Sequence, residues 1–491
     1  MKPCDAAVSG PHAEIAALSV IEIAEHIQRR DICCTEVTQA YLDRIAEFDG
    51  HDGLNAFLTH DPAAALEEAR RLDQVLLQDD YLGPLHGVPM AIKDALDTGD
   101  LRTTGGTKVL EHWHPKKDAE VVKQLRDAGA SIIGKTNLHE ASFGITSNNP
   151  HYGAVRNPYA RQCIPGGSSG GTGAAVSARL CAAGLGTDTG GSVRIPSALC
   201  GCVGIKPTRG RVNNAGMQGL SWTCDVSGPI ARSVADAALM LQVMSTRADV
   251  PPDVGDDLAS LPDLIEDTAA LEGMKIGLPR GFFATDNDPR VDACITEVAA
   301  ILEQQGALIS EVELSDMELA LPAGFTIVVP EAIVLTERYW GAVDPALRIE
   351  DQLENLGADV QSVFAGERGP AAQPVPAHAY LEAVNEARVR VCGAFERALD
   401  QVDLLLTPTT PAPAVPIEED VEMHLNDATV DTFSTFIRYT FGVSLAGLPA
   451  ISVPGGQTPA GLPLGVQFVG RAWGEAKLIE AAWAYEVAVS G

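Results

Sequence analysis

Two glycine-rich segments that contain serine lie close together in the chain, and they constrain its structure more than any other feature. The first is GGSSGG at residues 166–171, and the second is TDTGGS at residues 187–192. Glycine tolerates positive φ and lets the backbone approach another group closely. The surrounding region, residues 144–228, is dense in Gly, Ser, Thr and Pro, with short apolar runs between them. We therefore look for the functional site in this region.

Apolar spacing predicts helices and strands that alternate along the rest of the chain. Because some links between strands are too short for a crossover, the predicted class is α/β, with a single large mixed β-sheet wrapped by helices. The predicted helices lie within residues 18–48, 61–79, 118–130, 233–245, 291–306, most of 318–402, and 476–489. The predicted strands are residues 85–97, 131–137, 274–280, 307–314, 402–409, 449–455 and 465–470.

The chain shows no clear domain break after about residue 70. We expect an N-terminal helical arm over residues 1–70 and one α/β domain over residues 71–491, which includes a helical segment at about 315–400. Residues 246–272 are acidic and polar, and we expect them to form an exposed connection.

Charge and cysteine content narrow the functional class. Lys and Arg total 35 and Asp and Glu total 66, so the net charge of −31 argues against binding to nucleic acid or to an anionic membrane. The N-terminus has no signal-peptide pattern, and no run of about 18 apolar residues predicts a membrane span. The ten cysteines form no Cys-x-x-Cys pair, which favours free thiols and a cytoplasmic location.

Residues 129–136, GASIIGKT, match the P-loop pattern G-x-x-x-x-G-K-[ST]. A P-loop has a strand before its first glycine and a helix after its lysine. Here a predicted helix precedes Gly129 and the apolar strand lies inside the motif. The favoured interpretation is a helix that ends at Gly129 and is followed by a strand.

Ser168 and Ser169 both fit the nucleophile elbow G-x-S-x-G of α/β-hydrolases. That fold needs an Asp and then a His later in the chain. Only His378 and His424 follow, and neither lies in an evident catalytic loop, although chain order alone leaves His424 open.

Two histidine patterns resemble metal ligands in outline. They are His139-Glu140 and His112-x-His114, and no third ligand follows either at a sensible spacing. We therefore predict no metal and no cofactor.

Several longer segments occur in an order that resembles the amidase signature family. They are GPLHGVPMAIKDALD (83–97), AGASIIGKTNLHEASFG (128–144), GAVRNP (153–158), the span from Ile164 to Thr208, DVSGPIARSVADAAL (225–239), and GLPAISVPGG with GLPLGVQFVG (447–470). The resemblance covers about residues 15–490 and is weakest over 246–400. It implies the amidase signature fold, in which the helical segment at about 315–400 covers the substrate pocket.

The resemblance implies three catalytic residues, each carried over by its local motif. Lys93 lies in the lysine strand, Ser168 is the first serine of GGSSGG, and Ser192 is the serine of TDTGGS. The resemblance also implies a cis peptide bond before Ser168.

The chemistry of these residue types agrees with that assignment. A serine hydroxyl is a weak nucleophile until a base takes its proton. Lysine is such a base only when burial lowers its pKa from about 10.4, and the apolar residues 90–92 before Lys93 favour burial. We expect neutral Lys93 to draw a proton from Ser192 through Ser168. The backbone N–H groups of Thr189, Gly190, Gly191 and Ser192 are then expected to form the oxyanion hole.

The family position and the neighbouring residues give the rest of the candidate site. We expect Ser169, Asp188 and Arg194 to support the loop, with structural rather than catalytic roles. The residues expected to line the acyl pocket are Ser142, Phe143, Gly144 and Ile145.

The branch that the segments most resemble contains indoleacetamide and mandelamide hydrolases, which implies a small aryl or alkyl carboxamide as substrate and a monomer or homodimer. The same triad attacks carbamates and esters, so a carbamate (urethane) or ester hydrolase is the alternative within this chemistry. An alternative of another class is the glutamine-hydrolysing component of a tRNA-dependent amidotransferase, which acts only within a multi-subunit complex.

Overall fold

The computed structural model of the chain describes residues 12–245 and 269–490, together with Cys4, Ser9, Gly10, Leu258, Leu261, Ile265 and Glu266. Most of the predicted acidic connection at 246–272 lies outside the described residues.

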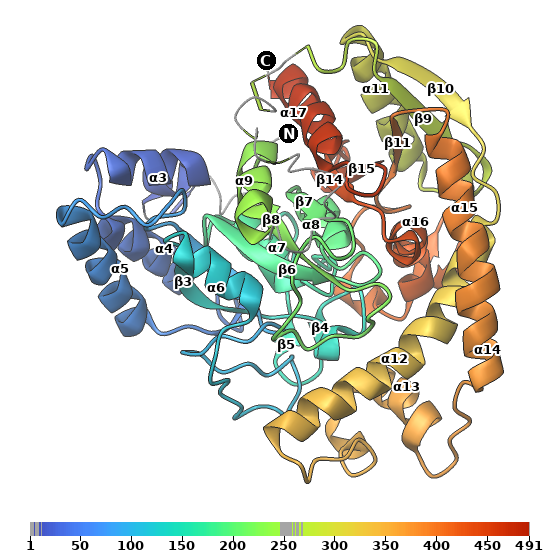
Figure 1. Ribbon diagram of the computed structural model, residues 1–491, viewed down its shortest axis with the longest axis horizontal. Helices are drawn as coiled ribbons and strands as arrows, with labels where there is room; N and C mark the ends of the chain where they lie inside the picture. Colours follow the sequence, from blue (N-terminus) through green and yellow to red (C-terminus); the bar gives the residue numbers. More distant parts are fainter. Residues whose placement is uncertain are drawn as a thin grey trace.

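One mixed sheet organises the described part of the chain, as the sequence predicts (Figure 1). Its strand order is β1-β3-β2-β6-β8-β7-β14-β15-β11-β9-β10. The neighbours β3, β2 and β6 are parallel, the strands from β6 to β11 pair antiparallel, and β11, β9 and β10 are parallel again. The strands are β1 (Phe57–Thr59), β2 (Pro89–Lys93), β3 (Ser131–Thr136), β6 (Ala183–Asp188), β7 (Val203–Lys206), β8 (Val226–Ala231), β9 (Lys275–Pro279), β10 (Leu308–Val312), β11 (Leu404–Pro408), β14 (Ala450–Gln457) and β15 (Pro463–Val469). Four strands lie outside this sheet: β4 (Asn148–Asn149), β5 (Gly153–Ala154), β12 (Glu422–Leu425) and β13 (Ala428–Asp431).

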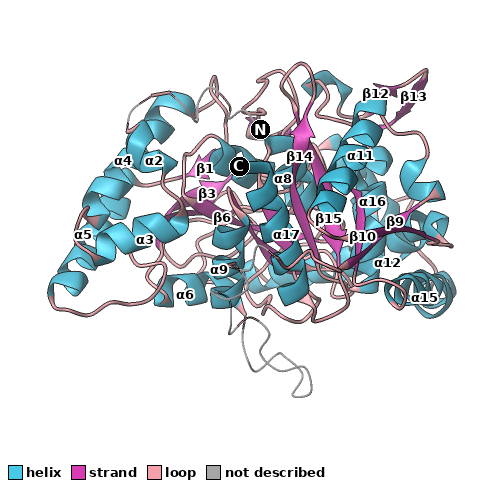
Figure 2. Cartoon of the chain, turned by 90° about the horizontal axis from the view of Figure 1, so that it is seen from above, coloured by secondary structure: helices cyan, strands magenta, loops and turns pink. Residues whose placement is uncertain are grey.

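Helices surround the sheet, which runs through the middle of the molecule in Figure 2. The longest helix, α12, crosses the lower right of Figure 1 next to α13 and α14, whereas α3, α4 and α5 lie at the opposite side. The helices are α2 (Ala13–Ala17), α3 (Val20–Gln28), α4 (Cys34–Phe48), α5 (Pro62–Leu77), α6 (Glu120–Asp127), α7 (Gly170–Ser177), α8 (Arg194–Cys200), α9 (Val234–Met244), α11 (Pro289–Gln304), α12 (Ala320–Val343), α13 (Ala358–Arg368), α14 (Ala377–Glu382), α15 (Arg388–Leu399), α16 (Thr432–Ala446) and α17 (Glu475–Ser490).

The first helices begin where the sequence supplies a cap. Ser19 accepts a hydrogen bond from the backbone N–H of Glu22, and the Glu22 carboxylate accepts one from the N–H of Ser19. This reciprocal pair satisfies two N–H groups that the first turn of α3 leaves free.

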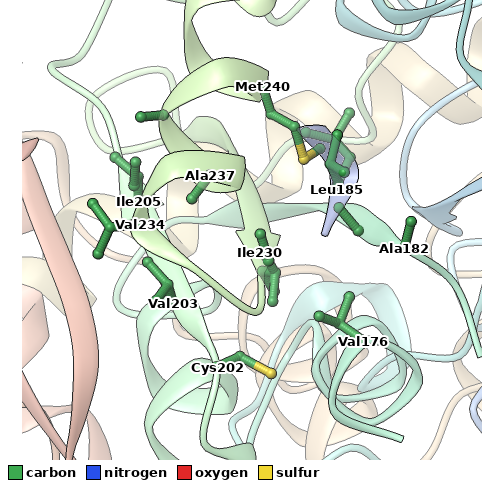
Figure 3. Close-up of a cluster of buried hydrophobic side chains, with 14 of the residues drawn as sticks. Val176, Ala182, Leu185, Cys202, Val203, Ile205, Ile230, Val234, Ala237 and Met240 are labelled. Carbon is green, nitrogen blue, oxygen red and sulfur yellow. The ribbon is translucent and has the colours of Figure 1, made fainter. Parts of the chain in front are cut away.

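The main hydrophobic core joins segments from both ends of the chain. It includes Val20 of α3, Ile92 of β2 and Tyr485 of α17, all of which are buried. Figure 3 shows its central part, where Val176, Leu185, Ile230 and Met240 pack between the sheet and the helices α7 and α9. A second cluster lies around α12, α15 and α16 and contains Phe395, Phe436 and Tyr439.

The sequence predictions miss several elements in the glycine-rich region. Strands β6, β7 and β8 were not predicted, and neither was α7, because GGTGAAVS contains three glycines and glycine favours a helix by about 1 kcal/mol less than alanine does. Close packing explains the glycines, since a Cβ at Gly171 would lie 2.3 Å from the carbonyl oxygen of Asn137.

The interpretation of residues 129–136 as a helix end and a strand is confirmed. Helix α6 ends at Asp127, and Gly129 follows with φ +95° and donates its N–H to the carbonyl oxygen of Arg126. Strand β3 occupies the place where a P-loop would surround phosphate. The buried Lys135 side chain donates to Thr103 and pairs with Asp94 at 3.0 Å, so it is held inside the protein.

The segment Met317–Val343 is, among the described helices, long and apolar enough to cross a membrane by length and composition. Half of its most apolar window is buried within the protein, and the helix packs against α16 and α15. Its carboxylate at Glu331 is fully buried and accepts hydrogen bonds from the hydroxyls of Ser221, Thr223 and Tyr380. These contacts account for the apolar character of α12 as that of a core helix.

Candidate active site

Lys93 lies at the carboxyl end of β2, next to the parallel strand β6. Because both strands end at the same edge of the sheet, Lys93 and Thr187 reach the same space. The Lys93 Nζ is 2.6 Å from Ser168 Oγ and 2.7 Å from Thr187 Oγ1. The side chain is fully buried, and burial lowers its pKa to about 7, against the opposing effect of Asp188 and Asp225.

The neighbouring Asp94 has different partners, as strand alternation predicts. Its carboxylate accepts hydrogen bonds from the backbone and hydroxyl of Thr104 and pairs with Lys135. The negative charge closest to Lys93 in sequence is therefore already compensated.

Ser168 lies in the loop before α7 and is fully buried. The peptide bond between Gly167 and Ser168 is cis. Ser147 holds this loop, because its hydroxyl donates to the carbonyl oxygen of Gly166 and accepts from the N–H of Gly170. Ser169, which was expected to support the site, contacts both the N–H and the carbonyl oxygen of Thr187 at 3.3 Å. It thereby fixes the second partner of Lys93.

Ser192 lies in the loop between β6 and α8, beside the Ser168 loop. The backbone N–H of Ser169 donates to the carbonyl oxygen of Ser192 at 3.2 Å. Ser192 is 7% exposed and lines a cavity. In the described part of the chain its hydroxyl forms no hydrogen bond, so it is free to contact a ligand.

The backbone of residues 189–192 is arranged as a donor loop. Within the described residues, the N–H groups of Gly190, Gly191 and Ser192 have no acceptor. Gly191 has φ +140°, and a Cβ there would lie 2.3 Å from Thr440 Oγ1, so the turn requires glycine. Thr440 of α16 also donates its hydroxyl to the carbonyl oxygen of Gly190, which fixes the direction of the loop.

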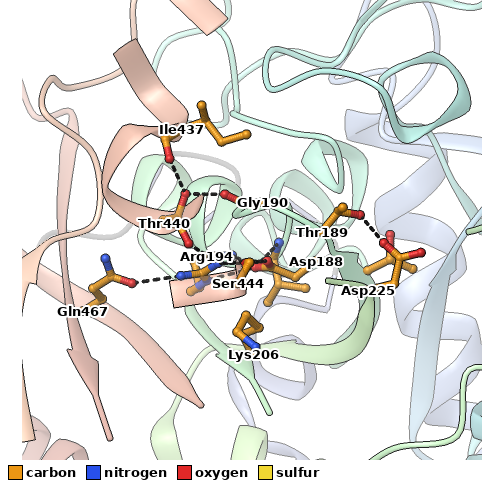
Figure 4. A network of polar contacts seen from close by, with 12 residues as sticks. Asp188, Thr189, Gly190, Arg194, Lys206, Asp225, Ile437, Thr440, Ser444 and Gln467 are labelled. Atoms are coloured by element: carbon orange, nitrogen blue, oxygen red, sulfur yellow. Dashed lines mark hydrogen bonds and ion pairs between the residues drawn. The ribbon is translucent and has the colours of Figure 1, made fainter. Parts of the chain in front are cut away.

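A buried ion pair supports this loop from behind (Figure 4). Arg194 forms two hydrogen bonds with Asp188, at 2.9 and 3.0 Å, and both side chains are fully buried. Burial alone would raise the pKa of Asp188, but the charges of Arg194 and Lys206 hold it below its usual value. Arg194 also reaches the carbonyl oxygen of Thr440 and the side chains of Ser444 and Gln467.

Asp225 is a site residue that the sequence interpretation missed. Its Oδ1 accepts a hydrogen bond from the Thr189 hydroxyl at 2.6 Å, and its Oδ2 accepts from the N–H groups of Leu220 and Ser221. Burial raises the pKa of Asp225 to about 6. The available signal was its position as first residue of the family-like segment 225–239.

Ser192 opens into a small cavity of about 40 Å³, called here the inner cavity. The four residues expected to line the acyl pocket, Ser142, Phe143, Gly144 and Ile145, all line it, together with Thr189, Gly190 and Ser192. Sequence analysis missed the rest of the lining, which comes from Leu220, from Phe325 and Val328 of α12, and from Phe433, Ile437 and Phe441 of α16. The helical segment that could not be assigned to the pocket thus supplies part of its wall.

The other patterns in the sequence have structural partners. His139 contacts Asp359 at 2.6 Å and His151 contacts Glu140 at 2.6 Å, while Glu140 also accepts the N–H of Gly357. These contacts tie the segment before the inner cavity to the start of α13. His112 and His114 are exposed, and His114 contacts the carbonyl oxygen of His112. No group of three or more metal-ligating side chains gathers among residues the structure describes.

The two histidines considered for a hydrolase triad lie elsewhere. His378 is exposed on α14 and His424 is exposed on β12, and neither lines the inner cavity. The base that contacts Ser168 is Lys93.

A large mixed sheet that brings one buried lysine and two loop serines together defines an enzyme of the amidase signature class. A sequence model of the amidase family matches residues 36–479, and the chain belongs to that family.

Three known proteins illustrate the similarity. The GatA-type component of the glutamyl-tRNA(Gln) amidotransferase from Moorella thermoacetica is 38% identical over 96% of this chain and 97% of its own length. The structure of native peptide amidase from Stenotrophomonas maltophilia matches with a TM-score of 0.84 and 33% identity, over 96% of each chain. A bacterial aryl acylamidase also gives a TM-score of 0.84 over 96% of each chain, and its 24% identity shows the fold alone.

Proposed function

We propose that this chain hydrolyses the C–N bond of a carboxamide through a covalent acyl intermediate on Ser192. The observation that carries the proposal is the short contact between Lys93 Nζ and Ser168 Oγ in a fully buried setting. A lysine whose pKa is about 7 is neutral in a large fraction of molecules at neutral pH and can accept a proton.

The first chemical step is the activation of the nucleophile. Neutral Lys93 takes the proton of Ser168 while Ser168 takes the proton of Ser192, and Ser192 Oγ attacks the carbonyl carbon. The two serine hydroxyls come within hydrogen-bond reach when the substrate binds, as is common for contacts that are long in a free enzyme.

The negative charge that develops on the carbonyl oxygen needs donors already in place. The N–H groups of Gly190, Gly191 and Ser192 have no acceptor in the described protein, which supports this role. Each donor in such a site contributes about 3 to 4 kcal/mol to the stabilisation of the transition state. Thr189, the fourth residue expected to contribute, is held to Asp225 by its hydroxyl.

The second half of the reaction reverses the proton path. Ser168 returns its proton to the leaving nitrogen, the C–N bond breaks, and the amine or ammonia departs. Water then loses a proton along the same path, attacks the acyl carbon and releases the acid and free Ser192.

The comparisons and the cavity favour different acyl groups. The sequence relatives support a glutamyl-tRNA(Gln) amidotransferase component, in which this chain would hydrolyse glutamine within a complex. The inner cavity supports a substrate with an apolar group near the carbonyl, because its side-chain lining is mostly aromatic and aliphatic and carries no charge. We propose the apolar carboxamide as the substrate class, and the amidotransferase component is the second candidate. The same three residues would attack an ester or a carbamate.

A substrate panel on the purified single chain tests these proposals. An aryl acetamide, an anilide, an ester, an aryl carbamate and glutamine are each incubated with the enzyme, and ammonia, amine or alcohol release is measured. Hydrolysis of the aryl acetamide supports the first candidate. Activity on glutamine alone, or activity that appears only with partner subunits, supports the second.

Ser192→Ala tests the nucleophile. We expect a loss of at least about 10⁴-fold in kcat and no acyl-enzyme by mass spectrometry, because no other group takes over the attack. Ser177→Ala on α7 is the matched control, since Ser177 is also buried but contacts none of the three residues. A Ser192→Ala protein with normal turnover would disprove the mechanism.

A further inference from the structure

The inner cavity is too small for a whole substrate. Its volume of about 40 Å³ admits the reacting carboxamide and little more. A second cavity of about 520 Å³, called here the outer cavity, shares five lining residues with it. The shared residues are Phe143, Gly144, Ile145, Phe325 and Phe433. The acyl group of the substrate must therefore continue into the outer cavity.

The outer cavity combines aromatic walls with negative charge. Its lining includes the carboxylates of Asp359, Asp420 and Asp431. Among the described residues that line it there is no lysine or arginine, and the sole histidine, His139, already contacts Asp359. A ligand in this space meets uncompensated negative charge at Asp420 and Asp431.

Both carboxylates keep one oxygen available. Asp420 accepts a hydrogen bond from the Asn148 side chain through Oδ2, and Asp431 accepts one from the N–H of Ser434 through Oδ1. The other oxygen of each has no partner in the described part of the protein. These contacts fix the positions of the carboxylates without neutralising their charge.

A separate observation at the inner end of this space points to a bound ligand. The Ser142 side chain is 6% exposed and lines the inner cavity, yet its hydroxyl has no hydrogen-bond partner within the described chain. A buried hydroxyl without a partner costs about 1 to 3 kcal/mol. A polar substrate atom next to the carboxamide would supply the missing partner.

We propose that the substrate is a carboxamide whose apolar acyl group ends in a positive charge, such as an ammonium, held between Asp420 and Asp431. This inference rests on the proposed function and specifies its substrate class. Anionic substrates are disfavoured, because no lysine or arginine among the described residues lines either cavity to pair with a carboxylate. Free glutamine, which carries a carboxylate, is disfavoured for the same reason.

Three matched amides test the proposal. They are 4-(aminomethyl)phenylacetamide, which is cationic, 4-ethylphenylacetamide, which is neutral, and 4-(carboxymethyl)phenylacetamide, which is anionic. We expect kcat/KM to fall in that order at low salt, with about tenfold or more between the cation and the anion. The difference should shrink in about 0.5 M NaCl, since salt screens charges that solvent reaches.

The double variant Asp420→Asn/Asp431→Asn tests whether the charge acts locally. Asparagine keeps the size of the side chain and can still cap α16 at position 431. We expect this variant to lose most of the preference for the cation while it retains kcat on the neutral amide. The matched control is Glu47→Gln/Glu67→Gln on α4 and α5, which removes the same charge from exposed positions on the opposite side of the molecule (Figure 1).

The outcomes separate this inference from the proposed function. Equal kcat/KM for the three amides, or a preference that survives in the Asp420/Asp431 variant, would overturn the inference and leave Ser192 catalysis standing. An equal loss of preference in the control variant would also overturn it, because the whole-molecule charge would then be the cause. Amide hydrolysis that persists in Ser192→Ala would instead overturn the proposed function.

Discussion

The chemistry of the site depends on the surroundings of single side chains. Lys93 is useful as a base because burial opposes its charge, whereas Lys135 is buried as well but paired with Asp94. Lys206 is a third buried lysine, and burial lowers its pKa to about 7 also. It donates to the carbonyl oxygen of Pro207 and contacts no serine among the described residues.

Lys93 and Lys206 give a test of the base through pH. Since Lys93 must be neutral, kcat/KM should fall about tenfold per pH unit below about pH 7 and level off above it. Lys93→Ala should lose most of the activity and this acidic limb of the pH profile, while circular dichroism shows an intact fold. Lys206→Met should keep the limb. An acidic limb that moves in Lys206→Met and not in Lys93 variants would contradict the assignment.

Sequence analysis found the reacting residues because local motifs mark them. Lys93, Ser168 and Ser192 each stand in a short segment with a distinct pattern, and the geometry brings Lys93 and Ser168 into contact. Asp225 was missed, because an aspartate before a strand carries no mark of a partner at Thr189, 36 residues away.

At the level of elements, loops and helices from distant parts of the chain build the site together. The donor loop between β6 and α8 is held by Thr440 of α16, and the same helix supplies Phe433, Ile437 and Phe441 to the cavity wall. A helical pattern in the sequence shows that a helix exists but not which cavity its apolar face lines. This is why the strand-borne site residues could be predicted and the wall residues could not.

The Arg194–Asp188 pair is the strongest link between the donor loop and α16. Arg194→Met should lower the free energy of unfolding by about 3 to 5 kcal/mol, because it leaves the Asp188 charge buried without its partner. Urea denaturation measures this change. The control is Arg29→Ala, which breaks the exposed pair with Glu25 and should change stability by less than about 1 kcal/mol. Equal effects of the two substitutions would show that the buried pair is not needed.

The whole molecule is organised by one sheet, and the predicted mixed α/β class is confirmed by it. The N-terminal arm remains a prediction as a separate unit. Residues of α3 and α4 belong to the same buried cluster as β2 and α17, and β1 pairs with β3. Such contacts couple the arm to the rest of the protein, which composition and sequence spacing could not reveal.

This coupling predicts a single cooperative transition. Ile23→Ala in α3 and Ile276→Ala in β9 each remove a fully buried side chain from the same cluster. Each should lower stability by about 2 to 5 kcal/mol and shift one thermal transition that activity and circular dichroism follow together. If Ile23→Ala instead produced an early transition that left activity unchanged, the arm would be an independent domain.

The proton path and the cavity wall come from different parts of the chain. The path uses residues 93–192, whereas α12 and α16 supply much of the wall. In a duplicated gene, drift in those two helices could retarget the enzyme to a new compound and leave bond cleavage intact. Ancestry and preferred compound are thereby uncoupled, and a homologue's name is a poor guide to what a given member consumes.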